Sequence, residues 1–172
     1  GTDDEPLELE KTDRGVVVSR WINGNMPSPY YAGLVKFTGK SDRLQHYEMC
    51  VPAIALNKSI YTPAGTGGDG KPITDLTYIN ISYNFMTPID EDNTRYFWFQ
   101  HRNTDPKDKV ISDKMNAGAR LAFEEDRSIL ENVHSGMKDK KTANIDLGLD
   151  AGAKQFRLML RRLIDEENQN NK

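Results

Sequence analysis

The chain has 172 residues, enough for one domain with a sizeable core. Its formal net charge is −3, and 37% hydrophobic and 28% charged residues are an ordinary balance for a globular protein. No run rich in Lys and Arg stands out, and no apolar run approaches the length of a membrane span, so neither nucleic acid nor a membrane is an expected partner. The single cysteine, Cys50, excludes an internal disulfide and fits a reducing compartment, the cytoplasm.

Both ends of the chain are polar. Residues 1–14 are a polar lead-in, expected to be frayed or to form the edge of a sheet, and residues 168–172 are a polar tail. Between them we expect a single domain. No signal peptide is visible, and the opening Gly indicates a sequence that begins inside a longer gene.

The first half of the chain is rich in strand signals. Residues 15–22 are β-branched and predict a strand, and residues 30–37 predict a weaker one. Residues 43–61 predict one or two strands, with Pro52 marking an edge, bulge or break. The glycine-rich residues 62–72 predict a mobile surface loop, which lacks the Lys-Ser/Thr ending of a phosphate-binding loop.

Residues 76–88 and 94–104 predict a β-hairpin around the turn at 89–93. The first strand alternates cleanly, so its residues divide into an apolar set (Ile79, Ile81, Tyr83, Phe85) and a more polar set (Tyr78, Asn80, Ser82, Asn84). The returning strand is aromatic on both faces, with Phe97 and Phe99 on one and Tyr96 and Trp98 on the other. Because such strands are usually buried on both sides, each side of this sheet is expected to be covered.

The second half of the chain is predicted to be helical. From residue 108 to residue 137 no proline intervenes, and apolar residues recur at steps of three and four. A polar connection over 135–150 leads to a last helix over 151–167. Strands followed by helices indicate the α+β class. We expect an antiparallel sheet curled around the long helix, with a cavity between them.

Asp126 lies on the apolar stripe of the long predicted helix, in register with Phe123, Ile129 and Leu130. An unpaired carboxylate buried there would be costly. One explanation is a structural pair with an arginine or a hydroxyl group of the sheet. The other is a metal ligand or a catalytic acid or base facing the cavity. The three histidines, His46, His101 and His134, show no metal-binding spacing, so a complete metal site cannot be assembled from these residues.

Several short motifs follow one another along nearly the whole chain. They are Arg20-Trp21 with Pro27 and Pro29, Thr87-Pro88 with Tyr96-Phe97-Trp98, Phe123-Glu124-Glu125-Asp126-Arg127 with Ile129-Leu130-Glu131, and Asp146-Leu147-Gly148 with Phe156-Arg157 and Arg162-Leu163-Ile164. In this order they resemble the C-terminal part of the catalytic domain of Rieske non-haem iron ring-hydroxylating oxygenase α subunits. The branch they resemble is that of vanillate O-demethylase and phthalate dioxygenase.

The resemblance implies a helix-grip, START-like fold with a C-terminal second helix and a substrate cavity. It also implies an Fe(II) held by two histidines and one carboxylate, and it assigns that carboxylate to Asp126. The family's [2Fe–2S] Rieske cluster needs two cysteines and two histidines, and its iron histidines form a local motif. This chain has neither, so we expect a fragment that lacks the Rieske domain and the iron-histidine segment. Such a fragment holds no catalytic residue and should bind no iron by itself.

For the whole protein, the resemblance implies aromatic compound catabolism. A ferredoxin or reductase would supply electrons, and O2 and mononuclear iron would hydroxylate or O-demethylate an aromatic or similarly apolar substrate. Asn84, Phe97, Phe99 and Met115 are the candidate substrate-binding residues, and a homotrimer is the expected assembly.

Two other interpretations stay open. The chain could be a stand-alone helix-grip domain that binds a small hydrophobic ligand without catalysis, with Asp126 as a structural acid. It could also be an oligomerisation or degenerate subunit.

Overall fold

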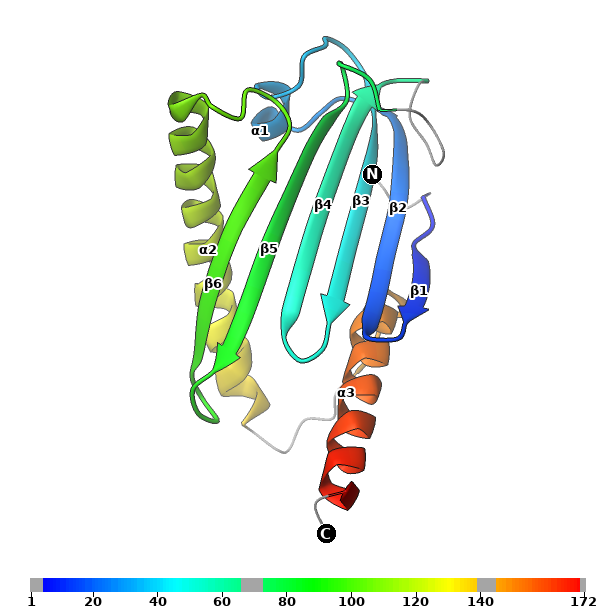
Figure 1. The fold of residues 1–172 in the computed structure, drawn as a ribbon, viewed down its shortest axis with the longest axis vertical. Helices are drawn as coiled ribbons and strands as arrows, with labels where there is room; N and C mark the ends of the chain where they lie inside the picture. The colour runs from blue at the N-terminus through cyan, green and yellow to red at the C-terminus, as the bar shows by residue number, and fades with distance from the viewer. Residues whose placement is uncertain (1–4, 66–72, 139–144, 171–172) are drawn as a thin grey trace. The chain divides into compact units, whose positions relative to one another are not determined.

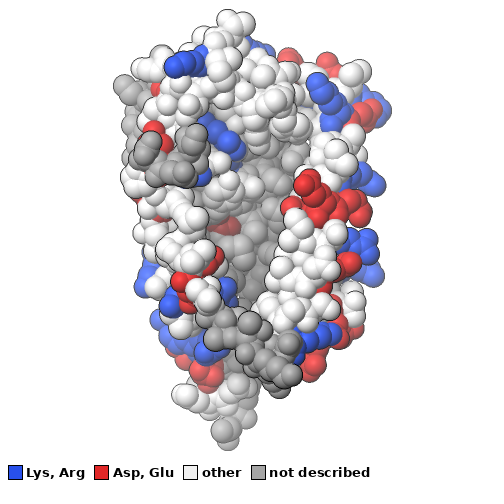
Figure 2. Space-filling model, turned by 180° about the vertical axis from the view of Figure 1, so that it is seen from behind, with Lys and Arg blue, Asp and Glu red and all other residues white. Residues whose placement is uncertain are grey.

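The computed structural model describes residues 5–65, 73–138 and 145–170. These residues form two compact units. The first comprises the chain up to Thr104 together with the segment from Gly148 onward, and the second runs from Asp105 to Leu147. On the side of the molecule drawn in Figure 2, Lys and Arg are mixed with Asp and Glu, and no large area of one sign forms there.

The first unit is built on a six-stranded antiparallel sheet whose strands are neighbours in chain order (Figure 1). The strands are β1 (Glu8–Thr12), β2 (Gly15–Asn25), β3 (Ser41–Cys50), β4 (Ile54–Pro63), β5 (Tyr78–Pro88) and β6 (Thr94–Arg102). The hairpin predicted from the alternating residues is confirmed as β5 and β6, with Phe85 directly opposite Phe97. The polar lead-in contributes β1 at the edge of the sheet.

Two prolines mark where the strand pattern breaks. Pro52 lies in the turn between β3 and β4, as predicted, and the Val51–Pro52 peptide is cis. The strand predicted over residues 30–37 is wrong, because the short helix α1 (Pro29–Ala32) occupies its start. Pro29 is the first residue of that helix, where the fixed backbone angle of proline favours a helical turn and its missing N–H is not needed.

A buried carboxylate ties three segments of the first unit together. Asp42 on β3 is almost fully buried, and its Oδ1 accepts a hydrogen bond from the Gly24 amide at 2.9 Å. Its Oδ2 accepts one from the Gly65 amide, after β4, at 2.7 Å. Both glycines have positive φ, a backbone conformation that glycine adopts without strain. The charge of Asp42 is therefore compensated by backbone donors, which identifies it as a structural acid.

The register of the strands divides the sheet into two faces. Face A is the side that carries Val18, Tyr47, Asn57, Ser82 and Gln100, which lie opposite one another from β2 to β6. Face B is the other side, and it carries Leu56, Tyr83 and Phe99. On β5 the polar set Asn80, Ser82 and Asn84 lies on face A and is buried, whereas the apolar set on face B is only half-buried. The polar side of this strand is thus its inner side.

The C-terminal helix α3 (Ala151–Asn170) packs on face A at β2 and follows a short 3-10 turn, η1 (Gly148–Asp150) (Figure 1). Gly152 lies directly against Val18, and a side chain at this position would overlap that valine. Phe156, one turn further along, is buried. The last predicted helix is therefore confirmed, and a glycine provides its closest approach to the sheet.

The second unit consists mainly of the long helix α2 (Lys109–Met137), which confirms the helix predicted over 108–137. Asp108 caps its first turn, because its Oδ1 accepts hydrogen bonds from the amides of Val110 and Ile111 at 2.8 and 3.1 Å. The two buried residues of α2, Met115 and Ala119, are four positions apart on one side of the helix. In the part of the chain that the structure describes, no helix is long and apolar enough to cross a bilayer.

Candidate functional site

Asp126 lies near the middle of α2, and its side chain is exposed. The apolar stripe on which it was predicted is exposed too, with Ile129 at 57% and Leu130 at 64% of their full accessibility. The guanidinium of the next residue in the chain, Arg127, pairs with Glu131 (Nε to Oε1, 2.8 Å). Within the described ranges the side chain of Asp126 forms no hydrogen bond or ion pair. The structural pair that would explain this acid is therefore not formed by these residues.

The described residues do not assemble an iron centre. They contain no group of three His, Cys, Asp or Glu side chains close enough to share a metal. His46 pairs with Glu48 at 3.6 Å, and His101 packs beside the rings of Tyr83 and Phe99 on face B. A single carboxylate on α2 is one of the three protein ligands that such an Fe(II) site needs, so the described residues alone do not complete it.

The candidate substrate-binding residues of the hairpin lie on opposite faces of the sheet. Asn84 is on face A and is buried, whereas Phe97 and Phe99 are on face B with 53% and 43% exposure. One pocket on one side of the sheet cannot be lined by all three. On β6, Trp98 lies directly opposite Asn84, and the hydroxyl of Tyr96, on the same face, donates a hydrogen bond of 2.6 Å to Asn84 Oδ1.

Both polar atoms of the Asn84 side chain form hydrogen bonds within the protein. Besides the bond from Tyr96, its Nδ2 donates to the Ala55 carbonyl at 3.3 Å. Asn80, two steps back on the same face, is different because its buried Oδ1 accepts no hydrogen bond from the described residues. Of the two amides, Asn80 has the free acceptor.

A row of three large side chains crosses face A close to the helix α1. The sequence pattern does not predict this row. Arg43 on β3 lies opposite Tyr61 on β4, which lies opposite Tyr78 on β5. We call these three residues the Arg-Tyr row. The guanidinium carbon of Arg43 is 5.2 Å from the centre of the Tyr61 ring, within the range of a cation–π contact. The rings of Tyr61 and Tyr78 are 6.4 Å apart.

The short helix α1 adds a third ring to the Arg-Tyr row. The ring of Tyr31 lies 4.7 Å from that of Tyr61 and 6.0 Å from that of Tyr78. It also lies 5.5 Å from the Arg43 guanidinium carbon. Tyr61 and Tyr78 are each only 1% exposed, whereas Arg43 is half-buried. Alternation along β5 places Tyr78 beside Asn80, but no local pattern indicates which residues of β3 and β4 lie opposite.

The polar atoms of this row lack partners. Arg43 Nε, the hydroxyls of Tyr61 and Tyr78, and Asn80 Oδ1 are buried and form no hydrogen bond within the described residues. The Ser28 hydroxyl lies near Tyr61 but does not complete a hydrogen bond of acceptable geometry. A buried polar group without a partner costs about 1–3 kcal/mol. These atoms take their hydrogen-bond partners from outside the described residues, from ordered water or from a ligand.

Burial keeps both tyrosines of the row protonated. Desolvation raises the pKa of Tyr61 to about 12, against smaller opposing effects of the Arg43 charge and of Ser28. Desolvation also raises the pKa of Tyr78, and the neighbouring Tyr31 and Tyr30 add to the effect. Both hydroxyls are therefore hydrogen-bond donors at neutral pH.

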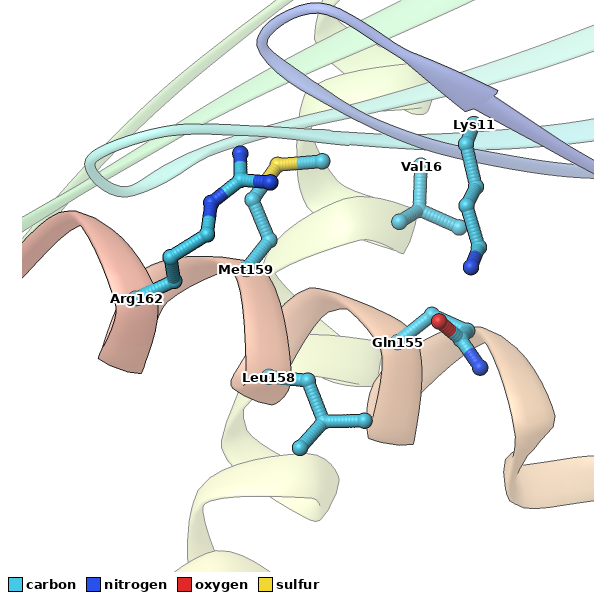
Figure 3. Close-up of a pocket in the computed structure, with 6 residues that line it drawn as sticks. All are labelled: Lys11, Val16, Gln155, Leu158, Met159 and Arg162. Carbon is cyan, nitrogen blue, oxygen red and sulfur yellow. The ribbon is translucent and has the colours of Figure 1, made fainter.

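A small cavity of about 220 Å³ lies between α3 and the first two strands (Figure 3). It is lined by Lys11, Val16, Gln155, Leu158, Met159 and Arg162. Figure 3 shows Lys11 and Val16 coming from the strands and the other four from the helix. Its surface is mainly apolar, so it is a packing gap with two cations and no reactive side chain.

A family model and the most similar curated proteins agree on one family. The family described as the vanillate O-demethylase oxygenase C-terminal domain matches residues 1–166. The toluene-4-sulfonate monooxygenase system iron-sulfur subunit of Comamonas testosteroni is 31% identical over 94% of this chain and 47% of its own length. The vanillate O-demethylase oxygenase subunit of a Pseudomonas strain is 24% identical over 96% of this chain and 52% of its own length. The chain thus spans about half the length of these curated relatives.

Solved structures share the fold. The crystal structure of dicamba monooxygenase bound to 3,6-dichlorosalicylic acid superposes with a TM-score of 0.84 at 18% identity, covering 96% of this chain and 48% of that one. The crystal structure of dicamba monooxygenase with non-haem iron and dicamba gives a TM-score of 0.72, also at 18% identity, over 95% of this chain and 50% of that one. The predicted α+β, helix-grip fold class is confirmed by this likeness.

Proposed function

Because this chain belongs to the family of vanillate O-demethylase oxygenase C-terminal domains, and so to the Rieske-type oxygenases, we propose that the complete protein hydroxylates or O-demethylates an aromatic or similarly apolar substrate with O2 and mononuclear iron. The family match over nearly the whole chain is the observation that carries this proposal. The names of the relatives support an aromatic substrate, since they specify toluene-4-sulfonate and vanillate.

We propose Asp126 as the carboxylate ligand of the iron in the complete protein. Two observations support this role. Asp126 is an acid on an otherwise apolar stripe, and none of the described residues pairs with it. The histidine ligands would come from a segment outside this chain. Bound there, the iron would supply O2 activation, while the exposed apolar residues beside Asp126 would be positioned to exclude water.

The substrate is proposed to bind on face A of the sheet. On β5 this face is buried over Asn80, Ser82 and Asn84, and it presents the amide of Asn80 and the hydroxyl of Ser82. A wall with a few fixed polar groups suits an aromatic ring that must be oriented. Met115, a buried residue of α2, stays a candidate contact. The electron donor is a ferredoxin or reductase, because a relative is named as part of a monooxygenase system. We also propose that the complete protein is a homotrimer and that it is cytoplasmic. The single cysteine supports the second of these, because it fits a reducing compartment.

The proposed role of Asp126 can be tested in the full-length protein by Asp126→Ala. We expect the variant to lose its mononuclear iron and substrate-dependent O2 uptake, since removal of one of three protein ligands leaves too few for useful affinity. Iron content and the absorption of the Rieske cluster are measured on the same sample, and the cluster should remain.

Asp113→Asn is the matched control, because Asp113 is a carboxylate on the same helix that pairs with Lys109 at 2.8 Å. It should retain both iron and activity. An Asp126→Ala protein with full iron content and turnover would remove the basis of the proposal. The 172-residue chain alone, titrated with Fe(II), should show no tight stoichiometric binding.

A further inference from the structure

We propose that face B of the sheet is an interaction surface, and that the half of the complete protein that lies outside this chain packs on it. The segment that packs there is apolar and carries a carboxylate that pairs with Lys58. The existence of that half rests on the proposed function. The choice of face B does not, because it follows from the side chains of the first unit alone.

Face B is open along four neighbouring strands, β3 to β6. Its side chains from Leu44 to Cys50, from Ile54 to Ile60, from Ile79 to Phe85 and from Phe97 to His101 are all half-buried or exposed. The helix α3 packs on the other face, at β2. None of the described residues therefore buries this part of face B.

The open part of face B is mainly apolar and aromatic. Its side chains form two rows across β4, β5 and β6, which we call the face B patch: Leu56, Tyr83 and Phe99 in one row, and Ile54, Phe85 and Phe97 in the next. Phe97 is 53% exposed and Phe99 is 43% exposed. A contiguous apolar area on a protein surface, rimmed by polar residues, marks an interaction site.

One cation lies beside the face B patch. Lys58 on β4 is half-buried, lies opposite Ile81 and is the next residue of this face after Leu56. Its neighbour on β3, His46, pairs with Glu48 at 3.6 Å, and no acid among the described residues pairs with Lys58. An ammonium group that becomes fully covered needs a carboxylate from the covering segment. The segment that packs on face B should therefore present an Asp or a Glu within an apolar surface.

The length of the relatives identifies what covers face B. The matching family is described as a C-terminal domain, and this chain spans 47% and 52% of two curated relatives. A half of the protein that is joined covalently to this chain is present at a high effective concentration, so a modest apolar surface is enough to hold it. Packing of face B on face B of a second copy is disfavoured, because each interface of a cyclic trimer joins two different surfaces.

The test compares the full-length protein with the 172-residue chain by thiol labelling, read by mass spectrometry of the labelled peptide. In the chain alone, Phe97→Cys should react with iodoacetamide at the rate of an exposed thiol. In the full-length protein it should react at least about tenfold more slowly, because the thiol is reached only when the covering segment opens. Lys58→Glu should restore fast labelling of that thiol in the full-length protein, whereas Lys58→Arg should leave it slow.

Leu158→Cys is the matched control, because Leu158 on α3 is 52% exposed, almost the same as Phe97. It should react at the same rate in both proteins. Equal rates for Phe97→Cys in the two proteins would show that face B stays open and would overturn the proposal. Equal slowing of both thiols would overturn it as well, because the shielding would then not be specific to face B.

A photo-crosslinker identifies the covering segment. Phe97→p-benzoylphenylalanine in the full-length protein should, on irradiation, become joined to a peptide that lies outside this chain, in a product of monomer mass. A product of dimer mass would assign face B to a second copy and would contradict the proposal.

The two proposals fail separately. Slow labelling of Phe97→Cys together with full iron content in Asp126→Ala would leave the interaction surface standing and remove the catalytic role. Fast labelling in an active, iron-loaded protein would do the reverse.

Discussion

The two faces of the sheet reverse the usual relation between polarity and burial. On face A the first four residues of β5 are Tyr78, Asn80, Ser82 and Asn84, and all four are buried. On face B the rings of Tyr83, Phe85 and Phe99 stack on one another, and Phe99 is 43% exposed. A polar face is buried at a cost, and that cost is understandable where the face binds a ligand.

Face B has a different character because its side chains already contact each other. Tyr83 and Phe99 lie 4.9 Å apart in a stacked pair directly across the β5–β6 ladder. Such cross-strand aromatic pairs stabilise a sheet even when they are partly exposed. The two faces of β5 therefore differ: ring contacts on face B strengthen the strands, whereas face A carries the buried polar side chains at which substrate binding is proposed.

The largest expected effect is a difference in stability between the two faces. Tyr61→Ala should lower the free energy of unfolding by about 3–5 kcal/mol, because it leaves a cavity in a fully buried position. Phe97→Ala on face B should cost less than about 1 kcal/mol, because its side chain is half exposed. Urea unfolding followed by circular dichroism measures both. Equal losses would show that face B is as much a part of the core as face A.

A smaller effect is expected where α3 covers face A. Gly152→Ala should destabilise the protein by about 1–3 kcal/mol, because the new methyl group would overlap the stiff side chain of Val18. Gly136→Ala is the matched helical control, since a methyl group there meets no atom within 4 Å. It should stabilise α2 by about 0.5–1 kcal/mol. If both variants behaved alike in thermal unfolding, the close packing of α3 on β2 would be contradicted.

The smallest effect concerns pH. Burial raises the pKa of Tyr61 from 10.0 to about 12, so the unfolded chain loses this proton at lower pH than the folded protein. The contribution to stability is complete below pH 10 and is lost as the pH rises toward 12. The free energy of unfolding should therefore fall with pH in this range, and less steeply in Tyr61→Phe. Identical slopes in the two proteins would argue that Tyr61 is hydrated on face A.

The strands and helices followed from local patterns with one clear exception. Alternation predicted β5, β-branched residues predicted β2, and steps of three and four predicted α2 and α3. The strand predicted over residues 30–37 is wrong. Its aromatic residues favour a strand, but Pro29 begins the helical turn α1. Local propensity is strong over long periodic segments and weak over short ones.

The candidate site was less accessible from the sequence. Both faces of β6 are aromatic, so the pattern could not indicate whether Phe97 or Tyr96 shares a side of the sheet with Asn84. The register settled this: Trp98 lies opposite Asn84, Tyr96 lies on the same face and donates to Asn84, and Phe97 is on the far side. The position of Asp126 on an apolar stripe was visible from spacing alone, and its role as a ligand stays a prediction.

By itself the sequence determined the order of the elements, the α+β class and the family, because these depend on local periodicity and on motifs within short segments. Only the tertiary structure decided which side of β5 is buried and that Arg43, Tyr61 and Tyr78 lie in one row. The physical reason is that alternation along a strand separates two faces without saying which is covered. The pairing of one strand with the next depends on contacts between residues far apart in the chain.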